Sequence, residues 1–352
     1  MLQVDYLIIG QGLAGSFLSH QLIGEGCSVM VVDEEKPDTA SKVASGVINP
    51  VTGRRMVRTW EIETLMPFAV KAYGQLGEEL GLPLIKQCNI LDFHPTPQMK
   101  LAFAERFPVE KEYLRLPENE HAWNNYFNYF FGYGEIEPCW LIDLGTMLEL
   151  WRKYLAKKSA LLEEKFVLEN CTIRKDAIEY KNILARKILF SDGVSGFSNP
   201  YFHLLPYANN KGEALIVAIP DLPSNHIYKQ GINIVPWRNN LFWVGSSYDW
   251  NYTDPHPSEA FKAKVLNQLN SWLKLPYQLI DHLASERPAN MERRPFVGLH
   301  PTHPSVGILN GFGTKGCTLA PFFAKQLSRH LLYDEPIMPE ADVRRFSRIL
   351  SR

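Results

Sequence analysis

The chain has 352 residues, of which 45% are hydrophobic and 21% are charged, and its formal net charge at pH 7 is −1. These values exclude a disordered or fibrous chain and are typical of a soluble protein with about two domains. A chain whose main task is to hold nucleic acid would carry a basic surplus, so the charge balance argues against a nucleic-acid partner.

Cysteine usage and the N-terminus predict a reducing compartment. The five cysteines are scattered without a CxxC pair, and no HExxH motif or Cys/His cluster indicates a metal. The N-terminus lacks a cationic segment ahead of an apolar run, and no uncharged apolar run approaches the roughly 18 residues that cross a bilayer. We therefore expect a cytoplasmic protein with no metal and no membrane partner.

The first 33 residues carry the pattern of a dinucleotide-binding unit. An apolar run, 4–9, predicts a buried strand, and Gly10-Gln11-Gly12-Leu13-Ala14-Gly15 leads from it into a helical stretch, 16–24. A second apolar run, 29–32, ends in Asp33. The glycines allow a tight turn, close approach to a pyrophosphate and helix-on-strand packing, and the acid can accept hydrogen bonds from ribose hydroxyls. This context favours dinucleotide binding over a purely structural turn.

The rest of the chain favours FAD over a nicotinamide nucleotide. After Asp33 the alternation of strand and helix stops, and residues 36–60 predict a loop of small side chains beside a ligand. A second glycine run, 311–316, lies between an apolar strand, 306–309, and a helix, 319–332. Too few residues follow it for an independent dinucleotide unit. We expect a second helix N-terminus that points at the same cofactor, where its dipole would stabilise an anionic reduced flavin.

The middle of the chain changes character twice. Residues 61–80 and 144–158 predict helices, and an aromatic cluster between Trp123 and Trp140 predicts either core packing or a wall above the flavin. Alternating apolar runs between 215 and 247 predict an antiparallel sheet. Asn239-Asn240 indicates a hairpin within it, because asparagine tolerates positive φ.

Several segments together resemble the D-amino-acid oxidase family of FAD-dependent oxidoreductases, which includes glycine oxidase and sarcosine oxidase. They occur in the family's order across nearly the whole chain. The matching segments are 10–15 with Asp33, 44–47, 134–136 with 141–143, 211–213, 234–236 with 244–245, 286–288, 294–298 and 311–316.

The resemblance implies an α/β fold with an α+β substrate part. A Rossmann-type FAD-binding domain of the glutathione-reductase-like kind is interleaved with a mostly antiparallel β-sheet substrate domain. We expect the FAD-binding domain to take residues 1–75, 141–205 and 286–352, and the substrate-binding domain to take 76–140 and 206–285.

The resemblance also implies the residues that hold FAD. The N-terminal half contributes Gly10, Gly12, Leu13, Ala14, Gly15, Asp33, Glu34, Ser41, Ser45, Gly46, Val47 and Val167, and the second glycine run contributes Gly311, Phe312, Gly313, Thr314, Lys315, Gly316 and Cys317. Two positions depart from the family's pattern. Ser285 replaces a glycine, and Asp192 stands where a small residue is expected near the flavin.

The implied activity is oxidation of the C–N bond of a small amine or amino acid, with hydride transfer to flavin and then to oxygen or another acceptor. Arg287 would bind the substrate carboxylate, which matches a guanidinium fork, although an arginine before proline also suits a surface ion pair. Lys315 would support reduced flavin or the reaction with oxygen, or would be solvated. Tyr228 and Tyr248 are candidate pocket hydroxyls, with core packing as the alternative.

Two other functions remain open. One is FAD-dependent modification of a tRNA base, for which Arg54, Arg55 and Arg58 form a local basic cluster. The other is a non-catalytic, FAD-bound scaffold. The sequence does not choose the amine, oxidase against dehydrogenase, covalent against non-covalent flavin at Cys317, or the oligomeric state.

Overall fold

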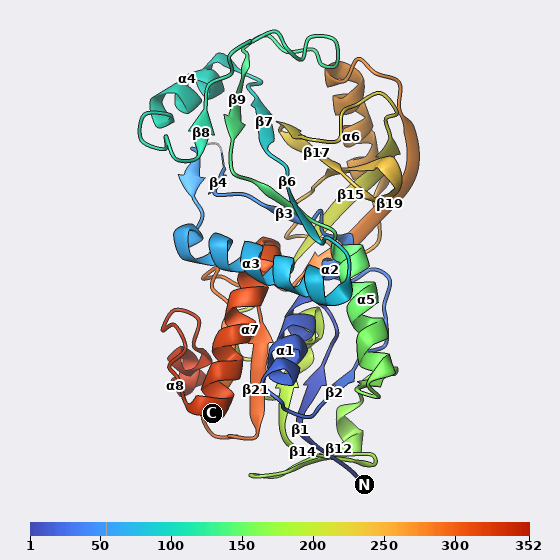
Figure 1. The fold of residues 1–352 in the computed structure, drawn as a ribbon, viewed down its shortest axis with the longest axis vertical. Helices are drawn as coiled ribbons and strands as arrows, with labels where there is room; N and C mark the ends of the chain where they lie inside the picture. The colour runs from blue at the N-terminus through green and yellow to red at the C-terminus, as the bar shows by residue number, and fades with distance from the viewer. Residues whose placement is uncertain (54) are drawn as a thin grey trace.

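The computed structural model describes residues 1–53 and 55–352 and contains two large sheets, one above the other in Figure 1. Within these residues each large sheet has eight strands, and two small sheets have three and two strands. The basic cluster of the sequence falls partly outside this description, because Arg54 is the residue between the two described ranges.

The lower sheet is built from short apolar runs that are buried on both faces, as is typical of a parallel sheet. Its strand order is β11-β2-β1-β14-β13-β12, and β21 adds to β14. The pairs β11–β2, β2–β1, β1–β14 and β14–β21 are parallel. The strands are β1 (Leu2–Ile9), β2 (Val29–Val32), β11 (Leu161–Leu162), β12 (Cys171–Ile173), β13 (Ile178–Tyr180), β14 (Ile183–Phe190), β20 (Phe296–Leu299) and β21 (Val306–Asn310).

Four long helices share one hydrophobic core with one face of this sheet. They are α1 (Leu13–Gly24), α3 (Ile62–Leu80), α5 (Leu144–Lys157) and α7 (Gly316–Tyr333). In Figure 1, α1 and α7 lie side by side, α3 crosses above them, and α5 flanks α1. The Phe17 ring on α1 meets Tyr73 on α3 edge to face at 5.0 Å. The opposite face is covered by a second core that includes Phe346 and Leu350.

The upper sheet is mostly antiparallel, in the order β19-β15-β18-β17-β16-β7-β9-β8, and only β16–β7 is a parallel pair. Its strands are β7 (Ile90–Phe93), β8 (Leu114–Arg115), β9 (Tyr133–Ile136), β15 (Asn210–Ala218), β16 (Ile227–Gln230), β17 (Ile232–Pro236), β18 (Leu241–Gly245) and β19 (Gln278–Arg287). Helix α6 (Glu259–Trp272) covers one face, while Ala214 and Trp243 on the other face join the core of the lower half. The space between the two sheets is therefore where β15 and β19 approach the glycine loops.

The remaining elements are short. They are β3 (Val47–Ile48), β4 (Val51–Thr52), β5 (Val57–Arg58), β6 (Ile85–Gln87), β10 (Trp140–Ile142), α2 (Ala40–Val43), α4 (Pro97–Arg106), α8 (Ser347–Leu350), and the 3-10 helices η1 (Leu168–Asn170), η2 (Gly193–Ser198), η3 (Arg238–Asn240), η4 (Gly313–Lys315) and η5 (Val343–Phe346). None of the helices in the described ranges combines the length and apolar character that a bilayer span requires.

The mixed α/β fold with an antiparallel upper sheet confirms the predicted fold class, whereas the residue boundaries of the two domains stay a prediction. The hairpin is confirmed, because β17 pairs antiparallel with β18 and both asparagines between them have φ of 57°. The expectation of one loop over 36–60 was wrong in detail, since α2, β3, β4 and β5 lie there. The aromatic cluster packs mainly as core beneath α6, where Phe127 stacks on Trp272 at 4.7 Å.

Candidate functional site

The first glycine loop brings three backbone segments into contact. A Cβ on Gly10 would lie 2.5 Å from the Ser191 carbonyl oxygen, and one on Gly15 would lie 1.9 Å from the Gly10 carbonyl oxygen. Only glycine fits these positions, so the start of α1 is fixed against β1 and the end of β14. No side chain caps α1 through its N-cap residue Gly12, which leaves N–H groups and a positive dipole end for an anionic ligand.

The second glycine loop ends beside the first. Helix α7 begins at Gly316 without a side-chain cap, and a Cβ on Gly316 would lie 3.4 Å from the Leu13 Cδ1 atom. The N-termini of α1 and α7, from opposite ends of the sequence, therefore converge as the sequence predicts (Figure 1). Both helix starts present partial positive charge to the same region.

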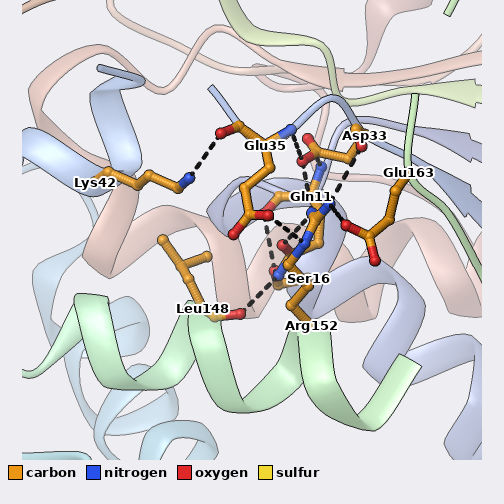
Figure 2. Close-up of polar contacts among 8 residues, drawn as sticks. All are labelled: Gln11, Ser16, Asp33, Glu35, Lys42, Leu148, Arg152 and Glu163. Atoms are coloured by element: carbon orange, nitrogen blue, oxygen red, sulfur yellow. Dashed lines mark hydrogen bonds and ion pairs between the residues drawn. The ribbon is translucent and has the colours of Figure 1, made fainter. Parts of the chain in front are cut away.

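Asp33 lies at the end of β2 and closes the first unit. Its Oδ2 atom accepts a hydrogen bond from the Gln11 backbone N–H at 2.8 Å, and its Oδ1 atom accepts from Arg152 Nη1 at 2.8 Å. Arg152 is on α5 and also contacts Glu35 and Glu163, as Figure 2 shows. The acid that the sequence predicts for a ribose is thus held by an arginine that the sequence did not indicate.

Several other predicted cofactor residues lie around these loops. Ser41 on α2 accepts a hydrogen bond from the Leu13 backbone N–H at 3.0 Å. Gly46 precedes β3, where its carbonyl oxygen accepts from the Ile142 N–H at 2.9 Å. By contrast, Glu34 forms an ion pair with Lys36 at 3.0 Å, and Val167 is a 37% exposed residue before η1. The roles of these residues remain predictions.

The donors and acceptors fit FAD. Glycine-lined backbone and two helix starts whose N-cap residues make no side-chain cap suit a diphosphate and an electron-rich ring, and Asp33 suits a ribose. Cys317 is buried, and burial raises the pKa of its thiol to about 12, so it is held as a neutral thiol. In the part of the chain that the structure describes, no group of three or more His, Cys, Asp or Glu side chains could hold a metal.

Arg287 lies at the end of β19, next to the second glycine loop, because the Gly313 N–H donates to the Pro288 carbonyl at 3.0 Å. Its Nη1 atom donates to Asn210 Oδ1 at 2.7 Å and to the Ser247 carbonyl at 3.2 Å. The guanidinium lies directly over Gly212, where a Cβ would be 1.8 Å from Nη2.

The part of the chain that the structure describes holds Arg287 without a paired carboxylate. No carboxylate of residues 1–53 or 55–352 forms an ion pair with it, and its Cζ atom lies 5.4 Å from the centre of the Tyr248 ring. Burial lowers the pKa of Arg287. The surface ion pair that the sequence left open is therefore absent among the described residues.

The lysine of the second glycine loop is only partly exposed, and its role stays a prediction. Lys315 Nζ donates to Asn49 Oδ1 at 3.0 Å, and burial lowers the pKa of the ammonium to about 8. No ion pair joins it to a carboxylate within the described ranges. It remains mostly protonated at neutral pH and adds a second cation near the helix starts.

The two candidate tyrosines lie in different surroundings. Tyr228 is fully buried in the core beneath α6, and its hydroxyl donates to the Pro223 carbonyl at 2.7 Å. Tyr228 as a pocket hydroxyl was therefore wrong, and core packing describes it. Tyr248 is 51% exposed, and its ring, rather than its hydroxyl, faces Arg287.

Sequence reasoning missed the residues that support the predicted ones. Asn210 and Gly212 hold Arg287, Asn49 holds Lys315, and Arg152 holds Asp33. Gly212 belongs to segment 211–213, which resembles the family, but the sequence assigned it no role. The other three carry no local pattern, because their partners are distant in sequence.

Comparison with known proteins identifies a matching family and several solved structures with a similar fold. A family model described as FAD dependent oxidoreductase (DAO) matches residues 5–330. Glycine oxidase from Bacillus cereus ATCC 14579 superposes with a TM-score of 0.80 at 15% identity, over 99% of both chains. Iminodiacetate oxidase IdaA from Chelativorans sp. BNC1 gives 0.76 at 18% identity over 98% of both chains. L-proline dehydrogenase from P. horikoshii gives 0.75 at 15% identity, over 99% of this chain and 98% of that one.

One curated relative is a longer protein, and this chain matches only part of it. The tRNA 5-methylaminomethyl-2-thiouridine biosynthesis bifunctional protein MnmC of Aromatoleum aromaticum is 24% identical over 379 aligned residues. The match covers 96% of this chain but only 58% of that protein. The chain therefore spans little more than half of the relative's length.

Two glycine loops next to a mostly antiparallel sheet are the arrangement that the sequence predicts for a flavin-dependent oxidoreductase. Because the family match covers most of the sequence, the chain belongs to the FAD dependent oxidoreductase (DAO) family, and its cofactor is FAD. The resemblance, the enzyme class and the cofactor that the sequence predicts are confirmed, and the individual site residues stay predictions.

Asp192, the acid that departs from the family's pattern, is accommodated at the junction of the two glycine loops. Its Oδ1 atom accepts from Asn310 Nδ2 at 3.1 Å, and its Cα atom would lie 3.3 Å from a Cβ on Gly10. Burial raises the pKa of Asp192 to about 7. The carboxyl group is thus partly protonated at neutral pH beside the first glycine loop.

This pKa predicts a pH dependence of stability. The folded state holds the Asp192 proton up to about pH 7, whereas an unfolded chain loses it near pH 4, so the contribution of Asp192 to stability falls as the pH rises between these values. We expect Asp192→Asn to flatten this fall by an amount on the order of a few kcal/mol. Urea unfolding of the flavin-free protein at pH 5, 6, 7 and 8 measures it, and parallel profiles for the two proteins would contradict the assignment.

Proposed function

We propose that the chain catalyses FAD-dependent oxidation of the C–N bond of a small amino acid or amine whose carboxylate binds to Arg287. The reaction removes a hydride, which is two electrons and a proton, from the carbon next to nitrogen, and the resulting iminium ion loses a proton from nitrogen to give an imine. Water hydrolyses the imine to a carbonyl compound and an amine or ammonia. The electrons pass to oxygen or to another acceptor. The names of the structural neighbours, which include oxidases of glycine and iminodiacetate and a dehydrogenase of proline, agree with this class.

The observation that carries the proposal is the unneutralised guanidinium of Arg287. A desolvated cation without a counter-ion is costly, so a protein that keeps one has built a site for an anion. Asn210 and the Ser247 carbonyl occupy only Nη1, and Nη2 lies over the bare backbone of Gly212. The fork therefore retains donors for a carboxylate.

Each residue then has a limited task. FAD, when bound, supplies the hydride acceptor. Arg287 anchors and orients the carboxylate, and the Tyr248 ring limits how its guanidinium can turn. Lys315 contributes positive charge at the loop, which favours the anionic reduced state of the cofactor.

One experiment tests the proposal directly. The absorbance spectrum of the purified protein reports bound flavin, and anaerobic mixing with a library of amino acids and amines reports which compounds bleach it. Bleaching by a carboxylate-bearing amine supports the proposal. Failure of every compound, with flavin bound and a tight protein partner present, would support a flavin-bound scaffold instead.

A second candidate is oxidation of a modified tRNA base, which the MnmC similarity supports. The basic cluster supports it less, because Arg58 is occupied by Glu63, Glu110 and Glu112. For a small-molecule enzyme we expect tRNA binding no tighter than the non-specific range, about 10⁻⁶ M or weaker near physiological salt. Titration of labelled tRNA at several salt concentrations measures it, and a nanomolar Kd would favour the tRNA function.

Removal of the Arg287 fork should abolish carboxylate anchoring. We expect Arg287→Met to lower kcat/KM for the best substrate by about 10²- to 10³-fold, because truncating one partner of a buried charge pair costs about 2–5 kcal/mol. Arg287→Lys should recover part of the loss, since it restores charge without the fork. Flavin absorbance per protein is the control, and unchanged kinetics in both variants would remove Arg287 from the site.

Gly212 should affect substrate binding indirectly, because its missing side chain leaves the space that the Arg287 guanidinium occupies. A Cβ in Gly212→Ala would overlap the guanidinium, which must leave its position over β15. We expect KM to rise at least tenfold while flavin content is retained. Gly74→Ala on α3 is the matched control, because a Cβ there meets nothing within 4 Å. Equal KM values in the two variants would contradict this role.

A further inference from the structure

Arg152 is a buried cation that the sequence motifs do not explain. It is 8% exposed and lies on α5, outside the strand–loop–helix–strand unit that ends at Asp33. Its neighbour Trp151 donates from Nε1 to Ser19 Oγ at 2.9 Å, and the Leu148 carbonyl accepts from Gln11 Nε2 at 3.1 Å. These contacts fix α5 against α1 and the glycine loop, so the guanidinium has a defined position.

The guanidinium binds every acid at this corner (Figure 2). Nη1 lies 2.8 Å from Asp33 Oδ1, Nη2 lies 3.1 Å from Glu163 Oε2, and Nε lies 3.2 Å from Glu35 Oε2. Nη1 also approaches Gln11 Oε1 at 3.4 Å, and Nη2 approaches the Asp33 carbonyl at 3.4 Å. One cation thus organises three carboxylates.

The hydrogen bonds of Asp33 leave it with little spare capacity. Oδ1 accepts from Arg152 and from the Glu35 backbone N–H at 2.9 Å, while Oδ2 accepts from the Gln11 N–H at 2.8 Å. Since each carboxylate oxygen has about two acceptor sites, one site remains, on Oδ2. A ribose diol has two hydroxyls, so the second must find an acceptor elsewhere. The glutamates that Arg152 holds are the acceptors at hand, with side chains 53% and 59% exposed for Glu35 and Glu163.

The charge balance of these residues agrees with one ribose hydroxyl binding to Asp33 and the other binding to a glutamate. Three carboxylates against one guanidinium leave a net negative corner, which favours hydroxyl donors and disfavours a phosphate on the ribose. Without Arg152, Asp33, Glu35 and Glu163 would lose the guanidinium that pairs with all three carboxylates, and repulsion would turn them apart.

We propose that Arg152 is a positioning residue for FAD, which aligns Asp33 with Glu35 or Glu163 as a joint acceptor for the adenosine ribose diol. It acts through these carboxylates and contacts no reacting atom. The proposal concerns the cofactor, so it stands independently of the substrate assigned to Arg287.

FAD affinity of the protein freed of flavin tests this role, with quenching of flavin fluorescence as the readout. We expect Arg152→Met to raise the Kd for FAD 10- to 100-fold and Arg152→Lys to raise it less. Lys153→Met is the matched control on the same helix, since Lys153 is a 66% exposed side chain paired only with Glu149 at 2.5 Å. It should bind FAD as the unmodified protein does.

A second measurement separates diol recognition from general support of the fold. ADP and 2′-deoxy-ADP compete with FAD, and the unmodified protein should prefer ADP at least fivefold. In Arg152→Met that preference should fall towards one. A Kd for FAD within twofold of the unmodified value would overturn the proposal, as would a weakened Kd with the ADP preference intact.

If Arg152→Met does not fold, Arg152→Lys and the double variant E35Q/E163Q decide the question. Both should lower the ADP preference while the unfolding midpoint changes little, because the two glutamate side chains are largely exposed. An unchanged preference in both variants would overturn the proposal.

Discussion

Close backbone contact at Gly10 and Gly15 is the constraint on which the rest of the structure depends. The Gly15 Cα lies so near the Gly10 carbonyl, and Gly10 so near Ser191, that no side chain fits between them. This contact fixes the start of α1 against β1 and β14. Helix α7 then packs on Leu13 through Gly316, so the second helix start is positioned by the first. The cofactor site exists because residues from both ends of the sequence meet there.

The protein treats its buried cations in two opposite ways. Arg152 is surrounded by three carboxylates, which makes it a structural centre whose outer oxygens can accept hydroxyl donors. Arg287 and Lys315 have amide or carbonyl partners and no carboxylate among the described residues. Because a neutralised cation has little left to offer an anion, only the second kind marks a site for anionic groups. Under the proposals made above, the first arrangement serves recognition of the cofactor's ribose, and the second serves recognition of the substrate's carboxylate.

Local signals explain what could be predicted from the sequence. The glycine loop, Asp33 and the Asn239-Asn240 hairpin depend on neighbouring residues, and each was found. The supporting contacts join residues far apart: Arg152 is 119 positions from Asp33, Asn210 is 77 from Arg287, and Asn49 is 266 from Lys315. No periodicity reports such pairs. Side-chain direction was equally hidden, because strand alternation decides that Tyr228 faces the core beneath α6.

The neighbours show how little of the specificity resides in the fold. Glycine oxidase and proline dehydrogenase share this backbone at 15% identity, with TM-scores of 0.80 and 0.75. Their names refer to glycine and to proline, in keeping with the rule that one fold can carry different functions through the side chains of its site. In this chain the Arg287 guanidinium lies over Gly212, and the absent Cβ of that glycine leaves room for it. A glycine carries no functional group, so the sequence alone does not mark such a position as part of a site. Under the role proposed for Arg287, binding of a carboxylate in this chain depends on a bare stretch of backbone as well as on the charged group.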